Sequence, residues 1–258
     1  MTDSARFSWT VLLPVKVLAR AKSRLGALAG DRRRELALAL ASDTVTAAAA
    51  CPQVARVMVI TSDPVAGPLL AALGALIVPD EPADRQARLA ALDATGRNAA
   101  GLDDAGLPAP AGGPVELGAQ EGLNAALRHG AAVAARRWPG TGLAALTADL
   151  PALRPAELAA ALRAVGDSPD PAAFVPDAAG VGTTLYAVRP GGEFRPRFGG
   201  ASRARHAASG ATELVLDDLA GLRRDVDTPD DLRAALALGA GPRTAALAGK
   251  LLADVEPR

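Results

Sequence analysis

Residues 54–78 read VARVMVITSDPVAGPLLAALGALIV, and this pattern indicates an α/β fold. Val54–Thr61 is an apolar run rich in valine and isoleucine, as expected of a buried strand. Pro68–Leu73 has a helix-like pattern, and Ala75–Val78 is a third short apolar run. Strands that alternate with helices form βαβ units with right-handed crossovers, which predicts a mostly parallel central sheet flanked by helices.

The alternation extends in both directions along the chain. Trp9–Leu13 is a short apolar run ended by Pro14, which predicts the first strand of the sheet. Asp31 is suited to cap a helix that runs to about Ala50. Further helices are expected at Leu123–Arg136, at Pro155–Val165 and from Thr228 to about Ala253, and further strands at Gly142–Thr147, Ala172–Val175, Thr183–Val188, Glu213–Leu216 and Gly221–Asp225.

Length and composition predict one domain over residues 7–254, because 258 residues can bury one substantial core. Residues 81–120 are dominated by alanine, glycine, proline and aspartate, and we expect a long loop or partly disordered insertion there. The 28 basic and 28 acidic residues balance, so no global field favours a nucleic acid partner.

The cysteine and hydropathy patterns favour a cytoplasmic protein. Cys51 is the only cysteine and His129 and His206 are the only histidines, which excludes an intramolecular disulfide and argues against structural zinc. No run of about 18 uncharged apolar residues is present, so no membrane partner is expected.

A basic loop follows the first predicted strand. The stretch LPVKVLARAKSRL, residues 13–25, places Lys16, Lys22 and Arg24 at the carboxyl edge of the sheet, where open α/β folds bind ligands. Triphosphate binding is one interpretation, and a solvated basic loop is the other. No glycine-rich Walker or Rossmann motif occurs there, which disfavours a P-loop kinase or a dehydrogenase.

Two acids follow predicted strands. Asp149 comes directly after Gly142–Thr147 and Asp225 ends Gly221–Asp225. Mg²⁺ takes one or two protein carboxylates together with phosphate oxygens, so the pair predicts a metal site. A helix cap for Asp149 and a solvated loop for Asp225 are the alternatives.

Two glycine-rich stretches carry hydroxyl groups. GVGTT, residues 180–184, suits close approach to a ligand or, equally, a tight hairpin turn. FGGASRARH, residues 198–206, combines glycines, a hydroxyl at a helix start and basic groups, a pattern typical of an anion-binding nest. We expect His206 to be structural.

The ordered motifs LLPVK, AKSRL, VITSD, LN, ADLP, GVGTTL, FGGASRARH and DVDTP resemble the 2-phospho-L-lactate guanylyltransferase family of coenzyme F-420 biosynthesis, including its members that use phosphoenolpyruvate. The resemblance implies a Rossmann-like α/β fold of the nucleotide-diphospho-sugar transferase type, related to molybdopterin guanylyltransferases. It also implies catalytic Lys16, Lys22 and Arg24. The implied binding residues are Pro14, Val15, Lys16, Lys22 and Asn124 for the nucleotide, Thr183, Gly199 and Ser202 for phosphoenolpyruvate, and Asp149 and Asp225 for Mg²⁺.

The implied reaction joins GTP to phosphoenolpyruvate, or to 2-phospho-L-lactate, and releases diphosphate. The resemblance ranks phosphoenolpyruvate first. A cytidylyl- or molybdopterin-modifying nucleotidyltransferase and a non-catalytic nucleotide-binding protein are the alternatives. The sequence leaves open whether the chain is a monomer or a homodimer.

Overall fold

The computed structural model describes residues 7–15, 25, 29–80 and 119–253. These residues form the strands β1 (Trp9–Pro14), β2 (Val54–Ile60), β3 (Leu76–Val78), β4 (Gly142–Leu146), β5 (Ala172–Pro176), β6 (Thr183–Val188) and β7 (Thr212–Glu213). Their helices are η3 (Gly30–Arg32), α2 (Arg33–Ala49), α3 (Ala66–Ala71), α5 (Ala119–Arg137), α6 (Pro155–Asp167), α7 (Ser202–Ala208), α8 (Ala220–Arg223), α9 (Pro229–Ala237) and α10 (Pro242–Ala253). The predicted insertion lies outside the described residues, apart from the first two residues of α5.

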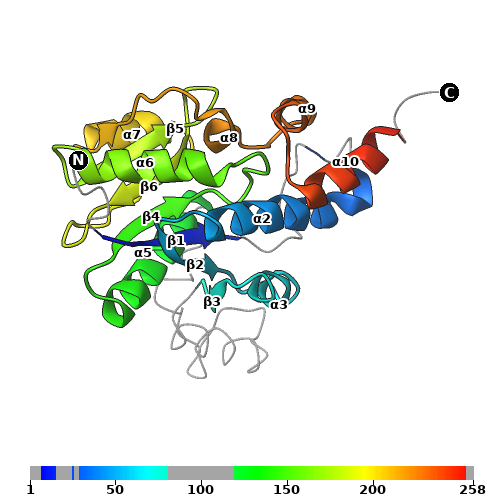
Figure 1. The fold of residues 1–258 in the computed structure, drawn as a ribbon. Coiled ribbons are helices and arrows are strands. Elements are labelled where there is room, and N and C mark those ends of the chain that lie inside the picture. The colour runs from blue at the N-terminus through cyan, green and yellow to red at the C-terminus, as the bar shows by residue number, and fades with distance from the viewer. Residues whose placement is uncertain (1–6, 16–24, 26–28, 81–118, 254–258) are drawn as a thin grey trace, which may run out of the picture.

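The seven strands form one sheet in the order β3-β2-β1-β4-β6-β5-β7 (Figure 1). β6 is antiparallel to its neighbours β4 and β5, and the other pairs are parallel. The prediction of a mostly parallel α/β sheet is therefore confirmed. β1 lies between β2 and β4, so the strand order reverses beside it, and in open sheets ligands bind outside the carboxyl ends of the strands at such a point.

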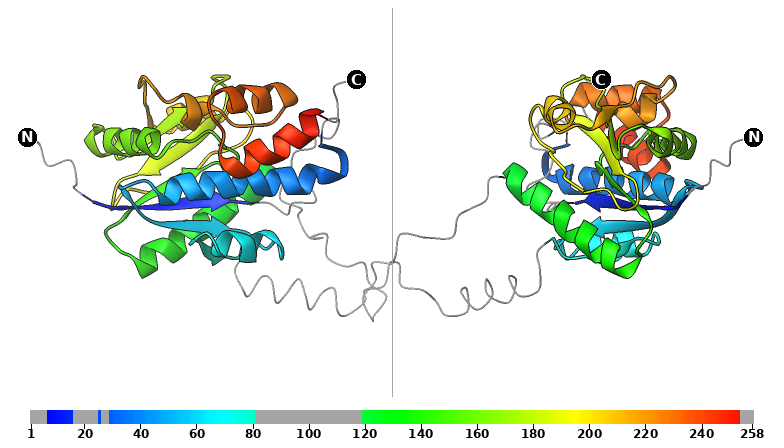
Figure 2. Two further views of the ribbon diagram at one scale, coloured as in Figure 1. Left: turned by 45° about the vertical axis from the view of Figure 1, so that its right-hand side comes forward. Right: turned by 90° about the vertical axis from the view of Figure 1, so that its left-hand side faces the viewer.

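Helices cover both faces of the sheet, and apolar β1 side chains on both faces are buried in hydrophobic cores. Val11 and Leu13 pack on one face with residues of α2, α3 and α6. Leu12, which points the other way, packs with Leu127 of α5. This alternation places α5 on the opposite side of the sheet from α2 and α6 (Figure 2).

The outer side of α2 carries a further helical layer. Leu36 and Leu40 of α2 pack with residues of α9 and α10. The buried carboxylate of Asp43 accepts the Thr244 N–H at 2.7 Å near the start of α10. No helix within the described ranges is both long and apolar enough to span a membrane.

Three local predictions were wrong. Asp31 lies inside η3 and no side chain caps either η3 or α2. Of the predicted strand at Glu213–Leu216, only Glu213 pairs in the sheet, as the last residue of β7. The predicted strand at Gly221–Asp225 is instead the helical turn α8 followed by irregular backbone. Contacts with α6, described below, override the strand propensity of so short a segment. The predicted helix start at Thr228 is confirmed, with its hydroxyl accepting the Asp231 N–H.

Candidate active site

The candidate site lies at the edge of the sheet where the parallel strands β1, β2 and β4 end. Pro14 and Ile60 are paired at the carboxyl ends of β1 and β2. β6 runs in the opposite direction, so its first residue, Thr183, reaches the same edge. There the Thr147 N–H, just past β4, donates to the Thr184 carbonyl at 3.0 Å. The antiparallel strand thus brings a hydroxyl-bearing residue to the edge where β1, β2 and β4 end.

Asp149 lies in the turn after β4 and is half-buried. Two hydrogen bonds fix this turn. The Leu150 N–H donates to the hydroxyl of Thr44, a fully buried residue of α2, at 3.0 Å. The Val226 N–H donates to the Asp149 carbonyl at 3.1 Å. Because Asp225 directly precedes Val226, the two acids predicted to bind a metal lie on neighbouring backbone segments.

The helical turn α8, which directly precedes the Asp225 segment, is held against α6. The Gly221 N–H donates to the buried Glu157 carboxylate of α6 at 3.0 Å. A Cβ atom on Gly221 would overlap the carbonyl oxygen of Ala152. A glycine is therefore required for α8 to approach α6 this closely, which is the physical reason that this segment turns instead of extending.

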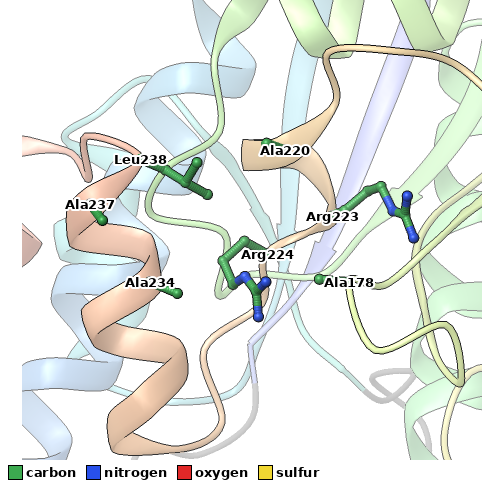
Figure 3. Close-up of a pocket in the computed structure, with 7 residues that line it drawn as sticks. All are labelled: Ala178, Ala220, Arg223, Arg224, Ala234, Ala237 and Leu238. Carbon is green, nitrogen blue, oxygen red and sulfur yellow. The ribbon is translucent and has the colours of Figure 1, made fainter.

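Arg223 and Arg224, the two residues before Asp225, line a cavity of about 390 Å³ (Figure 3). The Arg223 guanidinium donates to the carbonyls of Pro176 at 3.2 Å and Asp177 at 3.0 Å. These bonds connect the Asp225 segment to the hairpin that leads to Thr183. The other lining residues in the described part of the chain are apolar: Ala178, Ala220, Ala234, Ala237 and Leu238.

The glycines of the hairpin between β5 and β6 have a structural role. The Asp177 carboxylate accepts the N–H groups of Val181 at 2.9 Å and Gly182 at 2.7 Å. A Cβ atom on Gly182 would overlap that carboxylate, and Gly180 has a φ of +71°. The hairpin alternative is therefore confirmed for these glycines, and the turn delivers Thr183 to the edge of the sheet.

The second glycine stretch leads into α7. Gly199 and Gly200 have φ values of +96° and +46°, a conformation that favours glycine. Ser202 begins α7 and is only 2% exposed. Its neighbour Arg203 donates to the Gly180 carbonyl at 3.0 Å. This bond ties the start of α7 to the hairpin before Thr183, so the three predicted acceptor residues belong to connected segments.

His206 is buried among these segments. Its Nδ1 lies 3.0 Å from the Thr183 hydroxyl oxygen, and its Nε2 accepts the Arg197 N–H at 2.9 Å. The ring stacks on Tyr186 with 4.6 Å between centroids. Burial and, to a smaller extent, the positive charges of Arg205 and Arg197 together lower the pKa of His206 from 6.5 to about 4. The imidazole is therefore neutral at pH 7.

Asn124 of α5 contacts the backbone just before Gly199. Its amide donates to the Phe198 carbonyl at 3.0 Å, and its oxygen accepts the Phe198 N–H at 2.9 Å. The side chain thus positions the glycine stretch, a role that the sequence did not indicate. Its assignment to the nucleotide stays a prediction.

Of the residues predicted to bind the nucleotide near β1, the structure describes only Pro14 and Val15. Pro14 ends β1, and the Val15 N–H donates to the Ile60 carbonyl at 3.0 Å. The Val15 N–H is thus engaged in the sheet. Lys16, Lys22 and Arg24 lie outside the described residues.

Asp149 and Asp225 suit a metal ion that takes its remaining ligands from a bound substrate and from water. No group of three or more histidine, cysteine, aspartate or glutamate side chains in the described parts of the chain could bind a metal ion. Asp149 and Asp225 offer two carboxylates on adjoining segments. Such a donor set fits Mg²⁺, which commonly uses one or two carboxylates and completes its shell with phosphate and water.

Comparisons with known proteins agree with this architecture. A nucleotide-diphospho-sugar transferase structure from Desulfovibrio desulfuricans G20 superposes with a TM-score of 0.61 over 97% of this chain and 99% of that chain, at 15% identity. No family model matches the sequence. The phosphoenolpyruvate guanylyltransferase of Thermomonospora curvata is 52% identical over 250 residues, covering 97% of this chain and 92% of that protein. That of Streptomyces coelicolor is 54% identical over 245 residues, covering 95% and 97%.

The chain belongs to the phosphoenolpyruvate guanylyltransferase family. Phosphoenolpyruvate guanylyltransferases are nucleotidyltransferases, so the predicted enzyme class is confirmed. The family resemblance seen in the motifs is confirmed as well. The individual roles assigned to residues stay predictions.

The structure of this phosphoenolpyruvate guanylyltransferase family member also reveals supporting residues that sequence reasoning missed. Thr44 fixes the Asp149 turn, and Arg223 connects the Asp225 segment to the hairpin. His206, which the sequence predicted to be structural, contacts Thr183. Each contacts a backbone or side chain far away in the sequence. No motif or periodicity signals such a contact.

Proposed function

We propose that this protein transfers the guanylyl group of GTP to phosphoenolpyruvate and releases diphosphate. The product is enolpyruvyl-2-diphospho-5'-guanosine, an intermediate for coenzyme F-420 biosynthesis. The observation that carries the proposal is the identity of 52% and 54% to phosphoenolpyruvate guanylyltransferases over nearly the full length of both chains. 2-Phospho-L-lactate is the second acceptor to be tested, and it would give lactyl-2-diphospho-5'-guanosine.

The proposed chemistry is an in-line displacement at phosphorus. A phosphate oxygen of the acceptor forms a bond to the α-phosphorus of GTP while the bond from that phosphorus to the bridging oxygen of the β-phosphate breaks. The electron pair leaves with diphosphate. No protein nucleophile is needed, so the side chains act by orienting the two substrates and by balancing their charge.

Asp149 and Asp225 are the proposed ligands of Mg²⁺. The support is the backbone hydrogen bond from Val226 to Asp149, which makes the two acid-bearing segments neighbours. A bound Mg²⁺ would supply neutralisation of phosphate charge. Lys16, Lys22 and Arg24 are proposed to bind the phosphates of the nucleotide from the basic loop after β1.

Thr183, Gly199 and Ser202 are the proposed acceptor residues. The hydroxyl groups of Thr183 and Ser202 are suited to donate hydrogen bonds to the acceptor carboxylate or phosphate. The left-handed conformation of Gly199 suits close approach of the backbone to an anion. The Arg203 bond to the Gly180 carbonyl supports a single site formed from both stretches.

The test measures diphosphate release with each of the four nucleoside triphosphates and with each acceptor. We expect release with GTP and phosphoenolpyruvate. We expect weaker turnover with 2-phospho-L-lactate. The two acceptors differ mainly in that phosphoenolpyruvate has a planar methylene group where phospholactate has a tetrahedral carbon with a methyl group. A binding pocket usually distinguishes such a pair by about 1–3 kcal/mol. Turnover with CTP alone would indicate a cytidylyltransferase, and GTP binding without release would indicate a non-catalytic protein. The cytoplasmic location and a homodimer remain predictions.

A further inference from the structure

The His206 ring contacts every segment that carries a proposed acceptor residue. Its Nδ1 lies 3.0 Å from the Thr183 hydroxyl oxygen. Its Nε2 accepts the N–H of Arg197, two residues before Gly199. His206 itself belongs to α7, one helical turn after Ser202. One fully buried side chain therefore connects β6, the glycine stretch and α7.

The bond from Arg197 determines which ring nitrogen carries the proton. A backbone N–H can only donate, so Nε2 must accept and cannot itself be protonated. In the neutral imidazole the proton is then on Nδ1. Nδ1–H faces the Thr183 oxygen, which must therefore accept from the ring instead of donating to it.

This orientation decides where the Thr183 hydroxyl hydrogen points. The oxygen lone pair on the ring side receives the Nδ1–H, so the hydrogen must turn away from His206. Thr183 is at the start of β6, at the edge where the parallel strands end. Within the described part of the chain, the ring is the only hydrogen-bond partner of this hydroxyl, and Thr183 is 5% exposed.

We propose that His206 is a positioning residue of the site that binds the acceptor substrate. The Nδ1–H of the ring donates a hydrogen bond to the Thr183 oxygen. The Thr183 hydroxyl hydrogen therefore points away from the ring and is presented to an anionic oxygen of the bound substrate. The inference rests on the proposed function. It differs from a purely structural role, in which the stack of the ring on Tyr186 and its edge contact with Phe198 would be all that matters.

The kinetic test combines His206→Gln with Thr183→Val in a double-mutant cycle. Glutamine keeps an acceptor for the Arg197 N–H and removes the donor at the Nδ1 position. We expect His206→Gln to raise KM for phosphoenolpyruvate about five- to tenfold, the effect of one hydrogen bond, with KM for GTP unchanged. In the Thr183→Val background the same change should raise KM no further. His206→Asn, which retains an N–H near the Nδ1 position, should restore part of the loss.

Additive effects of the two substitutions, or an equal rise in KM for GTP, would overturn the role of His206. Nitrogen NMR of the wild-type ring tests it independently of variant folding, because the Nδ1–H tautomer is expected and the Nε2–H tautomer would overturn it. Wild-type protein that releases no diphosphate from GTP and phosphoenolpyruvate would overturn the proposed function instead. The two failures are therefore distinguishable.

Discussion

The backbone N–H of Val226 donates to the carbonyl oxygen of Asp149 at 3.1 Å. This bond joins the turn after β4 to the segment after α8, although the two are far apart in the sequence. It makes Asp225 a neighbour of Asp149 without any strand pairing between their segments. Because the bond uses only backbone atoms, either acid can be changed without removing it.

The first prediction concerns the proposed Mg²⁺ ligands, Asp149 and Asp225. Asp149→Asn and Asp225→Asn should each lower turnover at least about a hundredfold, because the swap keeps the volume and removes charge from a Mg²⁺ site. The melting temperature should change little. Diphosphate release at limiting Mg²⁺ measures the effect, with the exposed Asp217→Asn as the matched control. Wild-type rates in both variants would rule out the metal assignment.

The second prediction concerns Thr44. Thr44→Val keeps the shape of the side chain but leaves the buried Leu150 N–H without its acceptor. We expect the free energy of unfolding to fall by about 1–3 kcal/mol and more Mg²⁺ to be needed for half-maximal turnover. The control is Thr46→Val. Thr46 is an exposed residue half a turn further along α2, and its substitution should change the free energy of unfolding by less than about 0.5 kcal/mol. Equal effects in urea titrations of the two variants would contradict a special role for Thr44.

The third prediction concerns Gly221. Gly221→Ala places a methyl group against the Ala152 carbonyl and 2.7 Å from a Glu157 carboxylate oxygen. We expect a loss of about 1–3 kcal/mol in unfolding free energy, together with reduced turnover, because α8 supports the Asp225 segment. The matched control, Gly249→Ala in α10, meets no atom within 4 Å. It should instead stabilise the protein by about 0.5–1 kcal/mol, since alanine is the better helix former.

The fourth prediction is a dependence of stability on pH. The pKa of His206 is about 4 in the folded protein, against its ordinary value of 6.5. Between these values the unfolded chain binds a proton that the folded chain does not. Stability should therefore fall as the pH drops from about 6.5 to 4, by about 3 kcal/mol from this group, and this contribution should not vary above pH 6.5.

Denaturant titrations at several pH values measure this slope. His206→Phe, which keeps an aromatic ring but cannot titrate, should flatten it. An unaltered slope in His206→Phe would show that other groups cause the acid sensitivity.

Much of the fold could be predicted from the sequence because strands and helices leave local periodic patterns. The bounds of β6 and the starts of β1 and α6 agree with the predictions. The Gly221–Asp225 prediction failed because a five-residue segment has little propensity of its own. Its contacts with Glu157 and Ala152 outweigh that propensity.

The sequence by itself determined the α/β class, the order of the motifs and hence the family, and the chemical groups available at strand ends. These depend on residues near one another in the chain. Only the tertiary structure decided that β6 is antiparallel, that Val226 binds the Asp149 carbonyl and that His206 lies between Thr183 and Arg197. Such contacts join residues distant in sequence, and their geometry exists only once the sheet and its helices have packed, so no local pattern can encode them.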